Sequence, residues 1–446
     1  MTHFIYRGNT AFILALLLIS LAAAPVRAAD IAASGLRKVT FGEYLEAMEK
    51  HSLDLQNQRE NITHARAGVS IAGVRPDPVL TAGIASTELY GPNKPNASTA
   101  TTLGLAVTIE TAGKRGRRIL AAQSDVKLAE ANVGAFLHDI QTQSAAAFVE
   151  ACRTREALAR KQSSLKSLQE VVGANEARLK AGDIGMLELR QSRVEADRFA
   201  ADVASAAADA RAAEINLSAF LGRRFDEVFP GREVDSDLKR APLGFELSEL
   251  IRQALQNRDD IRVAKAALET AQANLHLTRA NRWVDPTVNV GLTNTPNVGP
   301  IFDASGNVAN SPAERSVALG LTVSIPIPFS RLQRGELTQA ETALRQARLQ
   351  LFSTTLKAET EVQAAYMQYR AAVLNVQSYV ERVLKEADLA LVGMRTSYRL
   401  GSASLLELLN ARRTADDVYL GYLQTVADLA NITVKLHISA GMRPDL

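Results

Sequence analysis

Residues 317–325 read Val-Ala-Leu-Gly-Leu-Thr-Val-Ser-Ile, and residues 103–109 read Leu-Gly-Leu-Ala-Val-Thr-Ile. In both stretches every second side chain is a large aliphatic one, and the side chains between them are small or polar. An alternation with a period of two is typical of a β-strand with one apolar face. Residues 288–293 alternate in the same way, and residues 79–89 do so less regularly. The sequence therefore predicts four strands, arranged as two pairs.

Each strand pair is followed by a long stretch without proline. No proline lies between Pro95 and Pro230, or between Pro328 and Pro444. Both stretches are rich in Ala, Leu, Gln, Arg and Glu, so each can hold an uninterrupted helix. A helix over about 113–180 would be on the order of 100 Å long at 1.5 Å per residue. We therefore expect two very long helical hairpins.

The two halves of the chain share landmarks at an offset of roughly 210 to 220 residues, which indicates an internal duplication. The matching pairs are Asp77-Pro78 with Asp285-Pro286, Leu187-Glu188-Leu189 with Leu406-Glu407-Leu408, and Gly222 with Gly441. We expect two repeats, residues 29–222 and 246–446, joined by a linker at 223–245. The expected strand pairs and hairpins are 78–112 and 113–221 in the first repeat, and 286–326 and 331–438 in the second.

The first residues have the pattern of a secretory signal peptide. An apolar run at 11–24 follows Arg7, and Val26-Arg27-Ala28 fits a cleavage site. A membrane anchor is the alternative, but the run is shorter than the roughly 20 residues of a spanning helix. We therefore expect residues 1–28 to be removed and the mature protein to be exported.

The four strands are close to the roughly 9 to 11 residues that cross a bilayer at a tilt. The alternative is a half-buried soluble sheet, which uses the same alternation. Four strands are too few to close a barrel, and an open edge in lipid leaves backbone groups unpaired. If the strands cross a membrane, several copies of the chain must share one barrel.

Composition argues against several other functions. The net charge of +3 and the lack of a basic stripe give no reason to expect nucleic acid as a partner. The sequence has no phosphate-binding glycine loop and no Gly-x-Ser-x-Gly elbow, so we expect no enzyme. The histidines are scattered and Cys152 is the only cysteine, so we expect neither a metal site nor a cofactor.

Taken together, a signal peptide, duplicated halves, two strand pairs and four long helices resemble the TolC family of outer-membrane efflux channels. Residues 398–412 resemble the family's turn pattern of an aromatic residue, Gly, and then Leu-acid-Leu-Leu-x-Ala, and residues 180–189 are a weaker twin. The resemblance implies an α+β membrane protein of the Gram-negative outer membrane that extends into the periplasm. Three chains would share a twelve-stranded β-barrel, with the long hairpins forming a periplasmic α-barrel. The implied partners are a periplasmic adaptor, an inner-membrane pump of the RND type and outer-membrane lipid.

The resemblance also implies roles for individual residues. The adaptor-docking hairpin tips would be Gly182, Asp183, Gly401 and Ser402, and the channel entrance would be formed by Glu407, Asn410, Glu188 and Tyr398. Glu188 and Tyr398 match two members of a hydrogen-bond network that holds the entrance shut, but Ala403 stands at the position of its arginine. A ring of three Glu407 carboxylates would attract cations, and their repulsion would raise the pKa of at least one. The alternative for Glu407 is a solvated helix residue.

Two further interpretations concern cargo and lipid. Residues 109–115 and 325–329, with Arg331 and Gly335, resemble the heavy-metal branch of the family, although Thr111-Ala112 stands where that branch has Leu-Gly. A channel for drug efflux or type I protein secretion is an alternative, and a periplasmic coiled-coil scaffold is one of another class. The basic clusters that begin both long helices could contact anionic lipid or simply be solvated; they are Lys114, Arg115, Arg117 and Arg118, and Arg331 and Arg334.

Overall fold

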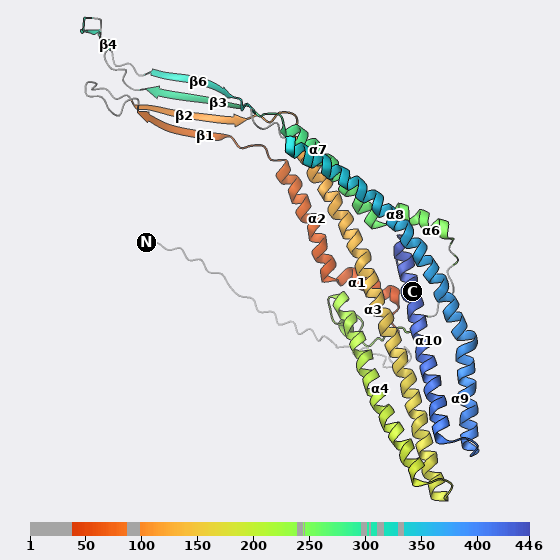
Figure 1. The fold of residues 1–446 in the computed structure, drawn as a ribbon. Helices are drawn as coiled ribbons and strands as arrows, with labels where there is room; N and C mark the ends of the chain where they lie inside the picture. Colours follow the sequence, from red (N-terminus) through yellow and green to blue (C-terminus); the bar gives the residue numbers. More distant parts are fainter. Residues whose placement is uncertain are drawn as a thin grey trace, which may run out of the picture.

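The computed structural model describes residues 38–86, 99–238, 244, 246–295, 301–302, 305–309, 316–328 and 334–446. The predicted signal peptide and Arg331 lie outside these residues. The molecule is elongated, with a β-sheet at one end and helices that run from it to two hairpin tips at the other end (Figure 1).

The first repeat contains two helices, two strands and a long hairpin. These are α1 (Phe41–His51), α2 (Leu53–Ala72), β1 (Val79–Ser86), β2 (Thr99–Thr108), α3 (Lys114–Ala181) and α4 (Met186–Leu221). A one-turn helix, α5 (Phe225–Val228), follows in the expected linker. The helices α1 and α2, which precede the strands, were not predicted from the sequence.

The second repeat has the same order of elements. These are α6 (Leu247–Asn257), α7 (Asp259–Asn281), β3 (Thr287–Thr295), β4 (Ile301–Phe302), β5 (Val308–Ala309), β6 (Ser316–Ser324), α8 (Arg334–Ser378), a π-helical turn η1 (Tyr379–Val383), α9 (Leu384–Arg399) and α10 (Leu405–Ser439). Between α8 and α9, η1 inserts a π-turn into the long helix.

The duplication is visible at the waist, the part of the molecule where the short helices α1 and α6 pack against the long helices. The helix pairs α1–α2 and α6–α7 each break at one residue with extended backbone, Ser52 and Arg258. Gly222 packs against the first break and Gly441 against the second, both with positive φ. A Cβ atom would lie 2.9 Å from the His51 carbonyl oxygen at Gly222, and 2.9 Å from the Arg258 nitrogen at Gly441. Both sites therefore require glycine.

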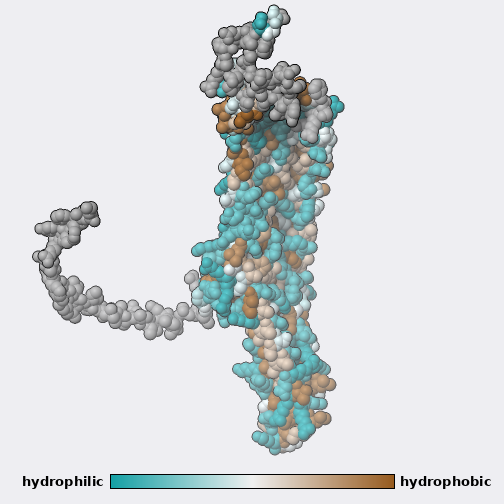
Figure 2. Space-filling view, turned by 90° about the vertical axis from the view of Figure 1, so that its left-hand side faces the viewer, coloured by the Kyte–Doolittle hydropathy of each residue, from teal (hydrophilic) through white to brown (hydrophobic). Residues whose placement is uncertain are grey.

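The sheet is antiparallel, with the order β1-β2-β3-β6. Its register places the alternating aliphatic residues of neighbouring strands opposite one another: Leu105 pairs with Val290, and Val290 pairs with Leu321. None of the described residues covers this face, since Leu319 and Leu321 are 73% and 70% exposed. Figure 2 shows hydrophobic side chains near the sheet end, above a helical surface that is mostly hydrophilic in this view. The sheet thus presents an unpartnered apolar face.

No helix in the described ranges combines the length and the hydropathy of a membrane-spanning segment.

Two pseudo-equivalent cores lie at the waist. In the first repeat, Tyr44 and Met48 of α1 pack with Phe148 of α3 and Leu217 of α4. In the second repeat, Leu250 and Ala254 of α6 pack with Val362 of α8 and Leu436 of α10. Each core anchors a long hairpin to the short helix that precedes its strands.

The junction between helices and sheet is held by ion pairs across the two repeats. Lys114 Nζ lies 2.6 Å from Asp285 Oδ2 and donates to the Trp283 carbonyl oxygen, also at 2.6 Å. Arg118 pairs with Glu110, and Arg115 Nε donates to the Gly73 carbonyl oxygen at 2.7 Å. These contacts tie the helix start to neighbouring segments, and the lipid interpretation of the basic cluster stays a prediction. Arg117, the fourth residue of the cluster, is exposed.

Candidate functional site

The far ends of the two hairpins turn at glycines with left-handed backbone. Gly182 has φ 80° and Gly401 has φ 76°. Each turn is closed by backbone bonds to the end of the preceding helix: Asp183 N donates to the Arg178 carbonyl oxygen at 2.9 Å, and Ser402 N to the Ser397 carbonyl oxygen at 2.9 Å. These bonds satisfy the last carbonyls of α3 and α9. The four residues predicted for adaptor docking therefore lie at the two exposed tips.

Glu407 caps the helix that begins after the second turn. Its Oε2 accepts from Ser404 N at 2.7 Å, while Ser404 Oγ accepts from Glu407 N at 3.3 Å, which together form a capping box. The bond from the Ser404 backbone lowers the pKa of Glu407. Within one chain the local effect on this pKa is thus opposite to the rise expected for a ring of three carboxylates.

The matching residue in the first repeat, Glu188, has a different partner. Its helix begins at Gly185, which has no side chain to form a capping box. The carboxylate of Glu188 reaches across to the second hairpin, where Oε1 lies 2.9 Å from the hydroxyl group of Tyr398. The first repeat thus has Gly185 where the second has Ser404. For this reason Glu407 caps its own helix, whereas Glu188 joins the two hairpins.

Tyr398 is the centre of a small buried network. Its hydroxyl group lies 2.6 Å from Asn175 Oδ1 as well as 2.9 Å from Glu188 Oε1. One hydroxyl proton cannot serve two acceptors, and Asn175 Nδ2 has no partner in the described chain. Turning the amide of Asn175 by 180° resolves this conflict, because Nδ2 then donates to Tyr398 and Tyr398 donates to Glu188. Burial, and then the bond to Glu188, raise the pKa of Tyr398.

An arginine also contacts this network, from a position that was not predicted. The guanidinium carbon of Arg178 lies 5.3 Å from the centroid of the Tyr398 ring, which is a cation–π distance. The structure places Ala403, where the family's arginine was expected, half-buried beside the second tip. Asn175 and Arg178 stand one turn apart near the end of α3, and their pairing with residue 398 gives no signal in the sequence.

Asn410 lies on an exposed part of α10, one turn beyond Glu407. It lines a groove of about 480 Å³ between α4 and α10 with apolar residues from both hairpins. Leu187 and Leu406, which are equivalent in the two repeats, are 69% and 67% exposed there. Arg413 and Glu195 close the groove with an ion pair of 2.6 Å. The structure therefore brings Glu188 and Tyr398 together, and leaves Glu407 and Asn410 on the surface of α10.

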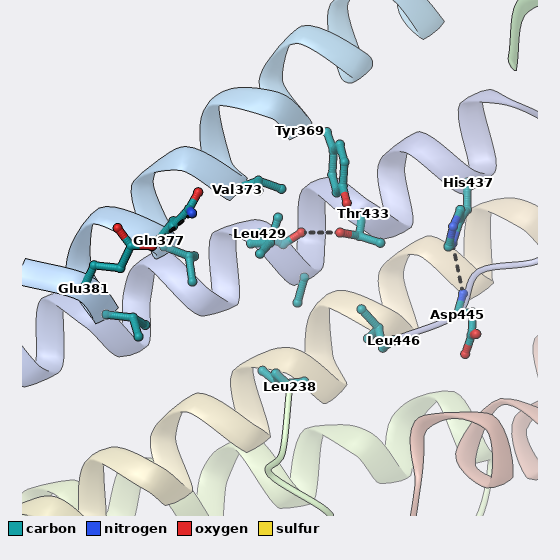
Figure 3. Close-up of a pocket in the computed structure, with 13 residues that line it drawn as sticks. Leu238, Tyr369, Val373, Gln377, Glu381, Leu429, Thr433, His437, Asp445 and Leu446 are labelled. Atoms are coloured by element: carbon teal, nitrogen blue, oxygen red, sulfur yellow. Dashed lines mark hydrogen bonds between the residues drawn. The ribbon is translucent and has the colours of Figure 1, made fainter. Parts of the chain in front are cut away.

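A separate cavity of about 370 Å³ lies at the waist, between α8–η1 and α10 (Figure 3). Its lining is largely apolar and includes Leu238 from the linker and Leu446 at the end of the chain. The polar groups at its rim bond locally: Gln377 Nε2 donates to Glu381 Oε1 at 3.0 Å, and Asp445 N donates to His437 Nδ1 at 3.2 Å. None of the residues predicted for the entrance or the tips lines this cavity.

Within the part of the chain that the structure describes, no three His, Cys, Asp or Glu side chains are grouped as a possible metal site.

Each half of the chain contributes one long helical hairpin and two strands of the shared four-stranded sheet. The chain matches the model of the "Outer membrane efflux protein" family over residues 45–223 and 250–441. It therefore belongs to the outer membrane efflux protein family, and the predicted efflux function and outer-membrane location are confirmed at this level. The two matched segments also fall on the two repeats.

Several proteins are similar to this chain over more than half of its length. "Cobalt-zinc-cadmium resistance protein CzcC" of Cupriavidus metallidurans is 23% identical, with 83% of this chain and 82% of the relative covered. "Protein CyaE" of Bordetella pertussis is 29% identical, covering 69% of this chain and 65% of that protein. "Cation efflux system protein CusC" of Escherichia coli strain K12 is 26% identical over 57% of this chain and 53% of its own.

Solved structures show the same fold. A crystal structure of CusC has a TM-score of 0.70 at 20% identity, covering 91% of this chain and 93% of that one. VceC of Vibrio cholerae has a TM-score of 0.68 at 20% identity, covering 91% and 97%. The predicted fold class, long helical hairpins with four strands in two repeats, is confirmed.

Proposed function

We propose that this protein is the outer-membrane exit duct of a tripartite efflux system that exports heavy-metal cations. The observation that carries the proposal is the uncovered apolar face of the sheet, joined to two hairpins long enough to extend far from a membrane. The family supports the efflux role. The periplasmic adaptor and the inner-membrane RND pump are the partners that the account requires.

The edges of the chain support a homotrimer. In the described sheet, β1 and β6 each pair on one side only. An unpaired strand edge is costly in lipid, so β6 of one copy would pair with β1 of the next. Three copies of four strands would then close a barrel.

The helical part of the chain has two outer surfaces, one formed by α4 and the other by α8. On one side α4 packs on α3, and on the other α8 packs on α7 and α10. Both outer surfaces carry exposed aliphatic residues: Ile215 on α4, and Leu349 and Leu356, seven residues apart, on α8. Heptad spacing is typical of a seam that packs on another helix. We expect the α8 edge of one copy to cover the α4 edge of its neighbour.

The tips supply a docking surface for the adaptor. Leu187 and Leu406 expose equivalent aliphatic groups in the two repeats, and the groove between α4 and α10 lies beside them. Exposed apolar groups rimmed by charged residues are typical of protein interaction sites. Gly182, Asp183, Gly401 and Ser402 form the turns that present this surface.

The contact between Tyr398 and Glu188 is the closing contact of the entrance in this account. It joins the second hairpin to the first within one chain, so parting the hairpins must break it. Glu407 and Asn410 would line the mouth, since both are exposed on α10.

The cargo assignment is supported by two relatives, whose names refer to cobalt-zinc-cadmium resistance and to cation efflux. Residues 109–115 and 325–329 support the same branch. Metal choice would then belong to the pump.

The experiment is a gene deletion in the host, complemented by the intact gene, with growth measured against zinc, cobalt, nickel, cadmium, copper and lipophilic antibiotics. Sensitivity to metals alone, restored by the gene, is expected. Sensitivity to antibiotics alone would contradict the metal assignment and favour a drug-efflux channel.

A tip variant separates docking from channel formation. Leu406→Asp places a charge on the proposed docking surface, and we expect it to lose metal resistance while the purified protein still forms channels. Asp202→Asn, an exposed change on α4 away from the tips, is the matched control. Full resistance with Leu406→Asp would argue against docking at this surface.

A further inference from the structure

A second polar cluster joins the two hairpins above the Tyr398 network. Asp416 of α10 accepts from two residues of α3: its Oδ1 lies 2.9 Å from Arg160 Nε and 2.8 Å from Ser164 Oγ. Asp416 is 7% exposed and Ser164 is 3% exposed. The cluster therefore joins the first repeat to the second through buried groups.

Arg412 completes the cluster from the preceding turn of α10. One of its terminal nitrogens donates to the Ser164 carbonyl oxygen at 2.5 Å, so Arg412 also bonds across to α3. Its Nε lies 3.9 Å from Asp416 Oδ2, and neither atom has a hydrogen-bond partner among the described residues. Burial lowers the pKa of Arg412, and the charges of Arg395 and Arg160 act in the same direction.

This cluster and the Tyr398 network lie on the same interface, the one between α3 and the second hairpin, which we call the seam. Along α3, the residues that face the second hairpin include Ser164, Leu168 and Asn175, all buried. Between the two polar groups the second hairpin contributes an apolar layer with Leu391 and Leu408, against which Val171 of α3 packs. The seam is thus polar, apolar and polar in succession from the waist to the tip.

Such a polar layer is costly to bury and stabilises only one register. A buried charge that loses its partner destabilises a protein far more than an exposed one does. Within helical seams, a buried polar group specifies register at a cost in stability. Asp416 has its cross-helix partners only when α10 sits against α3 as it does here, so the cluster selects this placement of the second hairpin.

We propose that Arg160, Ser164, Arg412 and Asp416 form a second closing contact of the entrance, which must separate together with the Tyr398 contact when the hairpins part. The proposal rests on the proposed channel function. The role of these four residues is to hold α10 against α3.

The test is single-channel recording of the purified protein in planar bilayers. Asp416→Asn keeps the shape of the side chain and removes its charge, and Arg160→Gln removes the partner. Both variants are expected to conduct severalfold more than wild type, and Asp416→Asn combined with Tyr398→Phe more than either alone. Arg211→Gln is the matched control, because Arg211 pairs with Glu214 and Asp226, both outside the second repeat, on the exposed surface. That control is expected to conduct as wild type does.

Three outcomes separate the proposal from its alternatives. Wild-type conductance in Asp416→Asn, alongside raised conductance in Tyr398→Phe, would overturn the second contact and leave the channel intact. Absence of any channels from wild type and Tyr398→Phe would overturn the proposed function instead. Should Asp416→Asn fail to fold, Ser164→Ala removes one bond of the cluster, and unchanged conductance in that variant would also overturn the proposal.

Discussion

The hydroxyl group of Tyr398 lies 2.9 Å from Glu188 Oε1, although 210 residues separate them in the chain. This bond joins the tip of the second hairpin to the first turn of the returning helix of the first hairpin. Glu188 can form this bond because Gly185 offers it no capping hydroxyl group. The equivalent glutamate, Glu407, is instead bonded to Ser404 in a capping box. The two repeats thus share a sequence pattern and use its carboxylate differently.

Gly185→Ser should weaken this bond. The new hydroxyl group would offer Glu188 the capping box that Ser404 offers Glu407, and Gly185 already has extended backbone that serine adopts readily. We expect α4 to gain a few tenths of a kcal/mol at its start, and single-channel conductance to rise. The matched control is Gly173→Ser, an exposed glycine within α3 with open space around it. Unchanged conductance in Gly185→Ser would show that Glu188 keeps Tyr398 as its partner.

Ala112→Gly should stabilise the protein. Ala112 has φ 53°, and among the described residues it is the one non-glycine with positive φ. Left-handed backbone costs an alanine roughly 1–2 kcal/mol, and the greater freedom of glycine in the unfolded chain offsets part of that gain. We expect a net stabilisation of about 0.5–1 kcal/mol, measured by thermal unfolding in detergent.

Ala174→Gly is the control for this comparison, since Ala174 is exposed and helical, within α3. It should destabilise by about 1 kcal/mol, because glycine is a poor helix former. A loss of stability in both variants would contradict the strain assigned to Ala112.

Asp259 should make stability depend on pH. Burial raises its pKa, but the hydrogen bond and charge of His138, with Arg262, lower it by more, and the net pKa lies below the ordinary value. A lowered pKa in the folded state stabilises the protein above the ordinary carboxyl pKa of about 4, and that contribution is lost as the pH falls through the folded value. Asp259→Asn should therefore be less stable than wild type at neutral pH, with a difference that shrinks in acid. A constant difference from neutral pH to pH 3 would exclude this role, and Asp202→Asn serves as the surface control.

Trp283 should mark the boundary of the membrane. It is the chain's single tryptophan, it is 68% exposed, and it lies between α7 and β3, where the uncovered apolar face begins. Tryptophan is enriched at membrane–water interfaces. In vesicles we expect its fluorescence to be quenched by lipids brominated near the headgroup more strongly than by lipids brominated deep in the chains. Quenching by aqueous iodide with no effect of either lipid would place Trp283 in water, and Trp283→Phe gives the background signal.

Much of the fold follows from local patterns. Period-two alternation reports the apolar face of a strand whatever that face contacts, so residues 103–109 and 317–325 were sufficient to predict β2 and β6. Proline-free stretches and the glycines at 182 and 401 predicted the hairpins, because helix continuation and left-handed turns are local properties.

Other features depend on contacts between distant residues. On α3 the structure buries Leu168 together with the polar residues Ser164 and Asn175. Apolar periodicity cannot find the last two, because their burial depends on Asp416 and Tyr398, more than 200 residues away. The π-turn at Tyr379–Val383 contains no glycine or proline from which it could have been predicted. Arg178 was not predicted either, because its contact with the Tyr398 ring depends on the packing of residues distant in the chain.

The single-channel conductance of purified wild type, compared with that of Tyr398→Phe, is the sharpest test of an entrance closed by the hairpin tips. The substitution removes one hydroxyl group, which costs about 1 kcal/mol of closing energy and leaves buried Asn175 without its partner. Tyr366→Phe, on α8 away from the tips, is the matched control. The account predicts a small conductance in wild type and Tyr366→Phe and a severalfold larger one in Tyr398→Phe. Equal conductance in all three would contradict an entrance closed by the hairpin tips.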